Sequence, residues 1–263
     1  MTAGFPCFTP PSPEDAAAFD RLIGEEIAAP PTREGIGRLN EKRMHRILRR
    51  FVRDDPSLWE TDAGGGYVAD IIDGGTLFEI QTGPLLPLKE KIAYYLESTD
   101  LQTVVIHPVA EKKYVVWIDP DNGSVSGRHL SPKKEGRGSV LASSVYIAEF
   151  FGTGRLTLRL LFIEEEEYRL LNGRRSADRK KGSERFERLP SKLLGELSLS
   201  SPADFRKLIP DTLPQRFTAA ELGKAGGLRG RDVYRAAKAL ELLGLAVPCG
   251  KRGRAAEWER VRV

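Results

Sequence analysis

The sequence predicts an α/β fold, a mixed β-sheet flanked by helices, followed by a smaller C-terminal domain. Two apolar runs rich in β-branched residues, separated by Asp-Gly-Gly, predict a hairpin over about residues 66–82. A helix through about residues 88–96 leads to the apolar strand 103–107. Strand, helix and strand in this order predict a βαβ unit with parallel strands. The last fifty residues change to two short helices and a second hairpin, which indicates a separate unit.

Composition and element order divide the chain into four parts. A helix that starts at Ser12-Pro13 and stops at Pro30-Pro31 would lie in a loosely attached N-terminal arm. The segment that follows the sheet is polar, basic and Gly-containing, which is typical of a linker. Further helices are expected at 40–52 and 140–151, and further strands at 113–119 and 155–163. The predicted boundaries are 1–33 for the arm, 34–168 for the sheet domain, 169–213 for the basic linker and 214–263 for the C-terminal domain.

The overall composition excludes several classes of protein. The 263 residues are 40% hydrophobic and 30% charged, as in ordinary globular proteins. The chain has no run of about 18 apolar residues, and its N-terminus lacks the basic start and apolar core of a secretory signal. We therefore expect no membrane contact and a cytoplasmic location. Cys7 and Cys249 lie near opposite ends, which argues against a disulfide framework, a zinc site and thiol catalysis.

The net charge of +4 conceals an asymmetry between the two parts of the chain. Residues 172–263 contain 21 Lys and Arg against 11 Asp and Glu, whereas the preceding residues contain 20 against 26. Neutralisation of phosphates supplies most non-specific affinity for nucleic acid, so a basic C-terminal part predicts a nucleic-acid partner. The alternative is a basic face that is merely solvated.

An acidic constellation lies on the predicted hairpin. Side chains alternate across a strand, so Glu79 and Gln81 project from the same face. A four-residue loop from Asp73 to Thr76 would place Asp70 directly opposite Glu79, and a two-residue loop would place it diagonally adjacent. Two carboxylates this close repel each other unless a cation or a proton lies between them. The hairpin therefore predicts a metal site, the alternative being that Glu79 lies on the solvent face of the strand.

The chemistry of such a site is that of phosphodiester hydrolysis. Divalent cations neutralise the charge of the scissile phosphate and lower the pKa of bound water. Magnesium takes only one or two carboxylates and keeps most of its waters. We therefore expect Mg²⁺ (or Mn²⁺) to be bound by Asp70, Glu79 and the main-chain carbonyl of Ile80, with Gln81 orienting the attacking water.

These residues resemble the PD-(D/E)XK nuclease superfamily, which has the restriction-endonuclease-like fold, over about residues 35–165. Its members carry a helix with Glu, then Asp, then Glu/Asp-x-Lys on a strand. The matching residues are Glu41, Asp70 and Glu79-Ile80-Gln81, and the segments EIQTG, VVIHP and SPKK resemble an uncharacterised bacterial branch. The resemblance implies that Glu41, Asp70, Glu79 and Gln81 are catalytic, with Glu41 assisting a second metal or orienting the ligands of the first.

Gln81 departs from this pattern, because the superfamily usually has Lys at the corresponding position. Glutamine cannot neutralise phosphate charge, so one electrostatic helper is lost. Lys89 or Lys91, on the following helix, would replace it by projecting back toward the site. The alternative is that both lysines are ordinary solvated helix residues.

The C-terminal part resembles a winged helix-turn-helix domain. Two helices, at about 219–224 and 231–243, are followed by a hairpin with a Gly/Lys/Arg tip. Basic residues lie on or just before the second helix, where a recognition helix meets phosphates and base edges. Alternatively, the two helices pack on the sheet domain or on a second subunit. The expected nucleic-acid-binding residues are Lys89, Lys133, Lys134, Arg229, Arg231, Arg235, Lys238, Lys251, Arg252 and Arg254.

Two functions of different classes are consistent with this sequence. The first is a metal-dependent nuclease that hydrolyses phosphodiester bonds in DNA, is targeted by its winged helix and forms a homodimer to cut both strands. The second, supported by Gln81, is a catalytically inactive DNA-binding regulator or structural protein. A nuclease acting on RNA is a further alternative.

Overall fold

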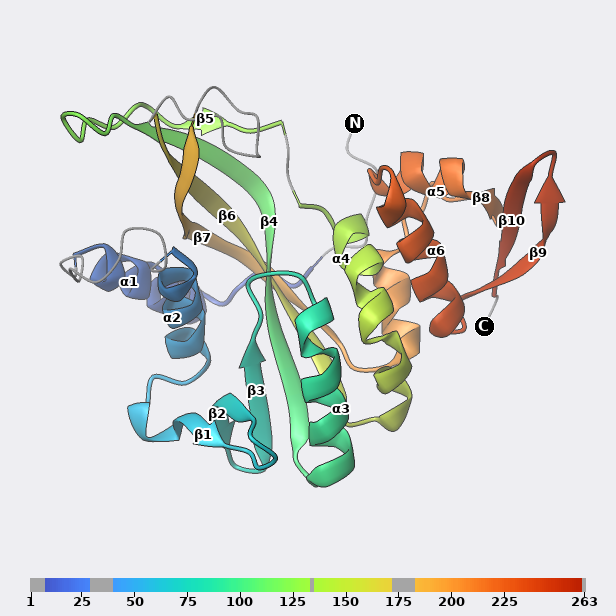
Figure 1. Cartoon of the computed structure of the whole chain (residues 1–263), viewed down its shortest axis with the longest axis horizontal. Coiled ribbons are helices and arrows are strands. Elements are labelled where there is room, and N and C mark those ends of the chain that lie inside the picture. The colour runs from blue at the N-terminus through green and yellow to red at the C-terminus, as the bar shows by residue number, and fades with distance from the viewer. Residues whose placement is uncertain (1–7, 29–39, 133–134, 172–182, 262–263) are drawn as a thin grey trace.

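The computed structural model describes residues 8–28, 40–132, 135–171 and 183–261. A mixed sheet with helices on both faces occupies most of the chain, as the sequence predicts (Figure 1). Residues 216–260, which we call the C-terminal module, hold a second sheet of three strands. The helices and strands before the module are α1 (Pro13–Ala28), α2 (Asn40–Val52), β1 (Trp59–Asp62), β2 (Val68–Asp73), β3 (Thr76–Ile80), α3 (Lys89–Ser98), β4 (Gln102–Ile118), β5 (His129–Leu130), α4 (Arg137–Ser143), β6 (Leu156–Leu170) and β7 (Glu184–Leu199).

The large sheet has the order β1-β2-β3-β4-β6-β7, with β5 paired to β4. Strands β1, β2 and β3 form an antiparallel meander, and β4 lies parallel to β3 after the crossover through α3. Strand β6 is parallel to β4, and β7 is antiparallel to β6. The predicted βαβ unit is therefore confirmed, because β3, α3 and β4 have this arrangement.

The hairpin register is the one that places Asp70 across from Glu79. Ile71 pairs with Phe78, and Asp73 pairs with Thr76. The loop is the two glycines Gly74 and Gly75, with φ of 53° and 84°, and this two-residue loop places Asp70 directly opposite Glu79 and not diagonally adjacent as expected. Positive φ at both central residues matches the twist of a hairpin and suits residues without Cβ.

Long strands replace several shorter elements predicted from the sequence. The apolar run 103–107 and the predicted strand 113–119 are two parts of one strand, β4, which carries an irregularity between Ala110 and Lys112. Strand β6 continues beyond the predicted strand 155–163 and through the acidic run at residues 164–167. The predicted helix at 140–151 is the shorter α4, followed by 3₁₀ turns.

The expected linker at residues 169–213 is wrong for the part of it that the structure describes. Strand β7 lies within this segment and pairs with β6 over its whole length, and Pro202–Leu208 forms a 3₁₀ helix with buried Phe205. Polar and basic residues gave this segment a linker-like composition. They are accommodated because Leu189 and Leu193 of β7 pack in the core, while Arg185 and Arg188 pair with Glu167 and Glu165 of β6.

Two cores lie on opposite faces of the sheet. Helices α1 and α2 cover one face with Phe19, Leu22 and Ile47, packed on Ile106 and Leu161 of the strands. Helix α1 is therefore part of the fold and not of a loosely attached arm. The opposite face is covered by α3 and α4, with the buried residues Leu85, Ile92, Val105, Val140, Leu141, Leu158 and Leu160.

The C-terminal module packs directly on this second core. Its apolar residues join those of α4 in one continuous hydrophobic cluster. Gly138 of α4 lies so close to Gly226 that an added Cβ would be 2.3 Å from the Gly226 carbonyl oxygen, so only glycine permits this contact. The elements of the module are β8 (Arg216–Thr218), α5 (Ala219–Gly226), α6 (Arg231–Leu242), β9 (Ala246–Arg252) and β10 (Ala255–Arg260).

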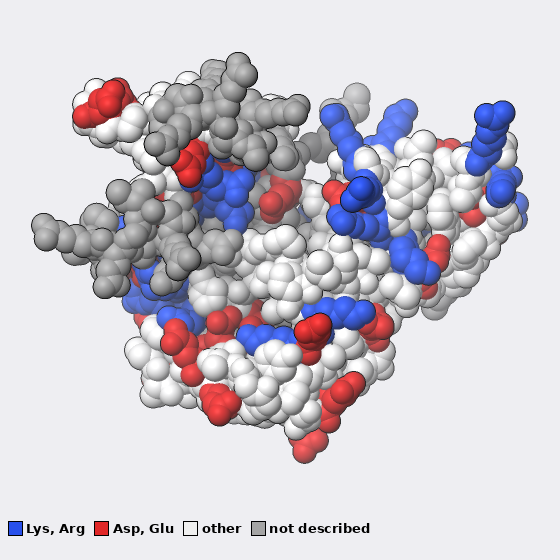
Figure 2. Space-filling model, in the orientation of Figure 1, with Lys and Arg blue, Asp and Glu red and all other residues white. Residues whose placement is uncertain are grey.

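Charge is distributed unevenly over the surface. Lys and Arg side chains project from the C-terminal module, whereas Asp and Glu side chains are most frequent along the lower edge of the sheet region, with some Lys and Arg among them (Figure 2). Within the described ranges, no helix has the length and apolar character needed to cross a bilayer.

Candidate active site

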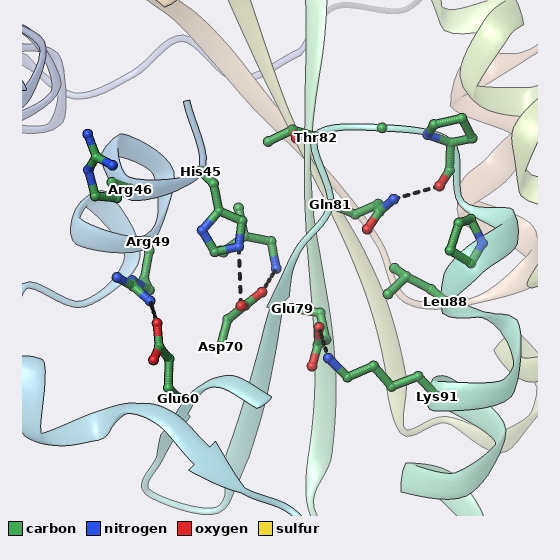
Figure 3. Close-up of a pocket in the computed structure, with 14 residues that line it drawn as sticks. His45, Arg46, Arg49, Glu60, Asp70, Glu79, Gln81, Thr82, Leu88 and Lys91 are labelled. Carbon is green, nitrogen blue, oxygen red and sulfur yellow. Dashed lines mark hydrogen bonds and ion pairs between the residues drawn. The ribbon is translucent and has the colours of Figure 1, made fainter. Parts of the chain in front are cut away.

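A cleft of about 690 Å³ opens between α2 and α3, at the carboxyl end of β3 (Figure 3). The loop after β3 closes one side of it, and β1 and β2 contribute acidic side chains. Both carboxylates singled out in the sequence line it. The polar and charged residues around the cleft are His45, Arg46, Arg49, Glu60, Asp70, Glu79, Gln81, Thr82 and Lys91.

Asp70 is held in place from two sides. One oxygen, Oδ2, accepts a hydrogen bond of 2.7 Å from the main-chain N–H of Ile80, and the other, Oδ1, lies 3.2 Å from Nε2 of His45. Burial raises the pKa of Asp70, but the hydrogen bonds from His45 and the Ile80 N–H and the charges of His45 and Lys91 together hold this pKa below its ordinary value. Asp70 is therefore ionised at neutral pH and oriented into the cleft.

Glu79 lies deeper, with only 3% of its surface exposed. Its Oε2 accepts a hydrogen bond of 2.7 Å from Nζ of Lys91, and its Oε1 accepts one of 2.9 Å from the hydroxyl of Tyr95. Burial and the negative charge of Asp70 raise the pKa of Glu79 to about 7, although Lys91 lowers it. Burial and Glu79 also raise the pKa of Tyr95, which keeps this hydroxyl a hydrogen-bond donor.

Lys91 therefore supplies a positive charge next to Glu79, close to the position where the sequence has Gln81 instead of a lysine. It comes from α3 rather than from β3, and one turn along the helix Tyr95 reaches the same carboxylate. Lys89 does not line the cleft. Its Nζ lies 2.9 Å from Glu149, in the 3₁₀ segment Ala148–Thr153. Of the two lysines that could replace the missing charge, only Lys91 has the required position.

Gln81 lines the same cleft, but its amide is used elsewhere. Nε2 donates a hydrogen bond of 2.6 Å to the carbonyl of Pro84, so the side chain bends toward the loop and away from the carboxylates (Figure 3). The main-chain carbonyl of Gln81 contacts Nδ1 of His107 at 2.7 Å. Gln81 thus stabilises the loop after β3 in this conformation, which the sequence alone did not predict.

Three of the expected residues lie outside the described part of the structure. Glu41 belongs to the first turn of α2, but its side chain is not among the described residues. Lys133 and Lys134 also lie outside them.

Helix α2 lines the cleft with three basic side chains that the sequence did not single out. His45, Arg46 and Arg49 all line the cleft. Arg46 is engaged with Glu26 of α1 at 2.8 Å, whereas Arg49 lies 3.1 Å from Glu60. Spacing of three and four residues along the helix was the available signal, because it places these side chains beside the buried stripe of α2.

A second cleft, of about 640 Å³, adjoins the first and shares Thr82, Gly83 and Pro84 with it. It lies between the sheet and the C-terminal module, because residues of β7 and of α6 both line it. Arg188 of β7 donates a hydrogen bond of 3.1 Å to the carbonyl of Thr82, at the junction of the two clefts. Its charged lining residues are Lys113, Glu135, Glu167, Arg185, Arg188, Asp232 and Arg235.

The basic residues predicted in the C-terminal module do not share one face. Arg235 points into the second cleft, with its guanidinium 5.7 Å from the centre of the Tyr146 ring. Arg252 is paired with Glu221 and Glu257 within the module, so it is not free at the hairpin tip. The others are exposed, with Lys238 paired to Glu241: Arg229, Arg231, Lys238, Lys251 and Arg254.

The donors present fit magnesium better than zinc. Within the part of the chain that the structure describes, no group of three or more His, Cys, Asp or Glu side chains is arranged to hold a metal. Asp70 and Glu79, however, share one cleft, and the charge of Asp70 raises the pKa of Glu79. This repulsion is what a hard divalent cation between two carboxylates relieves, and magnesium needs no more protein ligands than these.

A family model and one relative match this chain. A family model described as "Domain of unknown function (DUF8091)" matches residues 42–200, which extends to the end of β7 and beyond the predicted boundary at 168. A protein of Treponema pallidum (strain Nichols), described as an uncharacterized protein, is 25% identical over 227 residues, which cover 83% of this chain and 85% of the relative. No solved structure matches the chain.

Proposed function

We propose that this chain, which belongs to the DUF8091 family, is a metal-dependent nuclease that hydrolyses phosphodiester bonds in DNA. One observation carries the proposal: the carboxylates of Asp70 and Glu79 share a cleft in which a lysine reaches one of them and a histidine the other. The order of the antiparallel meander, helix and parallel strand around this cleft is the one that a PD-(D/E)XK nuclease would have, which supports the proposal.

Asp70 and Glu79 would hold a magnesium or manganese ion, with the carbonyl of Ile80 as a third ligand. When bound, such an ion supplies positive charge at the scissile phosphate and lowers the pKa of a water molecule. Asp70 is suited to this task because His45, the Ile80 N–H and Lys91 together keep its pKa low and the carboxylate ionised. Glu79 becomes a ligand once it loses its proton, and its pKa near 7 places this change close to neutral pH.

The chain's own cationic and basic groups have distinct tasks in this proposal. The ammonium group of Lys91 stabilises the negative charge that develops on the phosphate oxygens, which is the task usually given to the lysine of the motif. Because Nε2 of His45 lies 3.2 Å from Asp70, it orients this carboxylate toward the cleft. In the reaction the attacking water gives up a proton as its oxygen forms a bond with phosphorus, the bond between phosphorus and the 3′-oxygen breaks, and the leaving oxygen takes up a proton.

The C-terminal module would bring the site to DNA as a winged helix-turn-helix domain. The order of β8, α5, α6, β9 and β10 supports this proposal, as do the exposed Arg231 and Lys238 on α6. The module is packed on α4 and forms one wall of the second cleft. DNA would therefore contact the module and the sheet region together, and not a module held on a flexible linker.

The proposal includes a cytoplasmic location and a homodimer. Two cysteines without ligand-like spacing are ordinary for a reducing compartment. Cleavage of both strands of a duplex would require a second copy of the site.

A second candidate function is DNA binding without catalysis. The observation that favours it is the engagement of Glu79 by Lys91 and Tyr95, together with the use of the Gln81 amide by Pro84. In this alternative Lys91 permanently neutralises Glu79 and no metal is needed. Isothermal titration with Mg²⁺ separates the two functions, because only the nuclease requires a heat of binding that Asp70→Asn removes.

The direct test is cleavage of DNA by the purified full chain. Plasmid, linear duplex and single-stranded DNA, and RNA of the same sequence, are incubated with Mg²⁺, with Mn²⁺ or with EDTA, using wild type, Asp70→Asn and Glu79→Gln. We expect metal-dependent cleavage of DNA by the wild type and at least a hundred-fold loss in both variants, because each removes a ligand charge.

Asp73→Asn is the matched control. Asp73 lies in the same hairpin and pairs with Arg53 at 2.5 Å, outside the cleft. This variant should retain wild-type cleavage. The proposal is contradicted if a folded wild type does not cleave, or if wild type and Asp70→Asn cleave equally. Cleavage of RNA but not of DNA would make RNA the substrate.

A further inference from the structure

Arg49 has the features of a prepared anion-binding group. Its side chain is 11% exposed, and its guanidinium lies 4.3 Å from the centre of the Trp59 ring. The indole is itself fixed by a hydrogen bond of 2.9 Å to the carbonyl of Arg53. Among the described residues, no group accepts a hydrogen bond from the buried Nε of Arg49. Because this Nε is buried, an anion from the cleft would reach the guanidinium at Nη1, where Glu60 now lies, and the stacked, fixed side chain can bind it with little loss of side-chain freedom.

Glu60 covers this guanidinium from the solvent side. Its carboxylate lies 3.1 Å from Nη1 of Arg49, while 74% of its side chain remains exposed. Glu60 has φ of 50°, the one positive φ among described residues other than glycine. This left-handed conformation is unfavourable for a residue with a Cβ, and such conformations gather at functional sites. An exposed carboxylate held in a strained conformation can be exchanged for another anion.

We propose that Arg49 binds a phosphate of the nucleic-acid backbone next to the scissile one, and that the carboxylate of Glu60 occupies this phosphate's place until the substrate displaces it. The inference rests on the proposed function, because it takes the cleft to be the place where nucleic acid binds. It adds a phosphate-binding residue and a competing internal anion, neither of which the resemblance implies.

The position of Arg49 in the cleft favours a backbone phosphate. Arg49 and Glu60 line one wall, and Lys91 lines the opposite wall beyond Asp70 and Glu79 (Figure 3). A strand that crosses the carboxylates would therefore pass from one cation to the other. Its phosphates carry a full charge each, so they compete well with a carboxylate that solvent already reaches.

Just after the last residue of α2, the chain offers a matched control. Arg53 also pairs with a carboxylate, that of Asp73 at 2.5 Å, and lies 5.9 Å from an aromatic ring, that of Phe78. Neither Arg53 nor Asp73 lines the cleft. The substitutions Arg53→Gln and Asp73→Asn thus remove the same two charges from a similar ion pair that lies away from the proposed phosphate.

The experiment measures binding of a fluorescent single-stranded and a duplex DNA by anisotropy, in EDTA, over a range of salt concentrations. Arg49→Gln should weaken binding about ten-fold and lower the slope of log affinity against log salt by about one. Glu60→Gln should strengthen binding several-fold, because the competing anion is gone. Arg53→Gln and Asp73→Asn should each change binding less than two-fold.

If Arg49→Gln and Arg53→Gln bind DNA equally well, the proposed phosphate site is overturned. If Glu60→Gln binds DNA more weakly than wild type, the proposed displacement of Glu60 by the phosphate is overturned. Inorganic phosphate is a further arm: if it binds in an Arg49-dependent manner while DNA does not, the site belongs to a free phosphate and the inference fails. Because EDTA abolishes metal-dependent cleavage, these readouts do not require activity. A chain that binds DNA through Arg49 but never cuts it supports the inference and contradicts the nuclease.

Discussion

Two buried glutamates on this sheet, Glu79 and Glu167, have opposite electrostatic environments. Burial and the charge of Asp70 raise the pKa of Glu79 to about 7. Burial also raises the pKa of Glu167, but hydrogen bonds from Lys113 and Arg169 lower it to about 2. The residues have 3% and 2% of their surface exposed, so the depth of burial does not explain the difference.

The number of neighbouring cations explains it. Glu167 contacts Lys113, Arg169 at 2.6 Å and Arg185 at 3.5 Å. Among the described residues, Lys91 is the one cation that pairs with Glu79, and the carboxylate of Asp70 lies nearby. A buried carboxylate with sufficient cations is part of the framework, whereas one that lacks positive charge is where an added cation would be stabilised. The comparison therefore separates a structural network from a candidate site.

The largest effect expected from this comparison is on activity. Glu79→Gln should lower DNA cleavage at least a hundred-fold at pH 8 without lowering the unfolding midpoint in urea, because the neutral amide removes the repulsion by Asp70. Cleavage rates and urea unfolding of the same preparations check this. A variant that loses activity only because it unfolds would remove the distinction between the two glutamates.

Glu167→Gln should have the converse effect on stability. Removing its charge leaves buried cations without a partner, and we expect the free energy of unfolding to fall by about 3 kcal/mol. Chemical denaturation at pH 7 measures this loss. Cleavage per folded molecule should stay within two-fold of wild type, and a selective loss of cleavage would place Glu167 in the functional site as well.

The pH dependence of stability distinguishes the two glutamates next. The pKa of Glu79 is raised in the folded protein from 4.5 to about 7. Its contribution to stability is therefore complete below pH 4.5 and is lost as the pH rises through 7. In EDTA, Glu79→Gln should become more stable relative to wild type by up to about 3 kcal/mol between pH 5 and pH 8.

Glu167 provides the comparison for this titration. Its pKa is lowered to about 2, so its contribution is present above 4.5 and is lost only as the pH falls through 2. The difference in unfolding free energy between Glu167→Gln and wild type should therefore be constant from pH 5 to pH 8. A constant difference for Glu79→Gln as well would contradict the raised pKa of Glu79.

The smallest effect expected is that of replacing Lys91, the cation that pairs with Glu79. Lys91→Gln should raise the pKa of Glu79 further, move the midpoint of the pH–activity curve up by about one unit and lower cleavage at pH 7 about ten-fold. Lys89→Gln, which breaks only the exposed pair with Glu149, should leave both unchanged. Equal pH curves for the two variants would show that Lys91 does not control Glu79.

Local patterns were sufficient for much of the architecture. The Gly-Gly turn and the β-branched runs determine the hairpin, and its register brings Asp70 opposite Glu79. The apolar spacing of α2, the crossover through α3 and the helices of the C-terminal module were also predicted correctly. Each depends on residues close in sequence, for which turn chemistry and periodicity are informative.

Other features could not be predicted because they depend on partners distant in sequence. Strand β7 has a linker-like composition, and only its pairing with the acidic run of β6 makes its charged residues acceptable in a sheet. His45 and Asp70 are far apart in sequence, and only the fold brings Nε2 of His45 to within 3.2 Å of Asp70. Gln81 was expected beside the carboxylates, but the loop after β3 supplies a closer acceptor, the carbonyl of Pro84.

The amino-acid sequence by itself determined that two carboxylates face the same side of one hairpin, because side-chain alternation and a glycine turn leave little choice. Only the tertiary structure decided which side chains meet them: Lys91 rather than Lys89 at Glu79, and His45 of α2 at Asp70. The reason is that electrostatic interactions depend on distance and burial, and both are set by how α2 and α3 pack on opposite faces of the sheet.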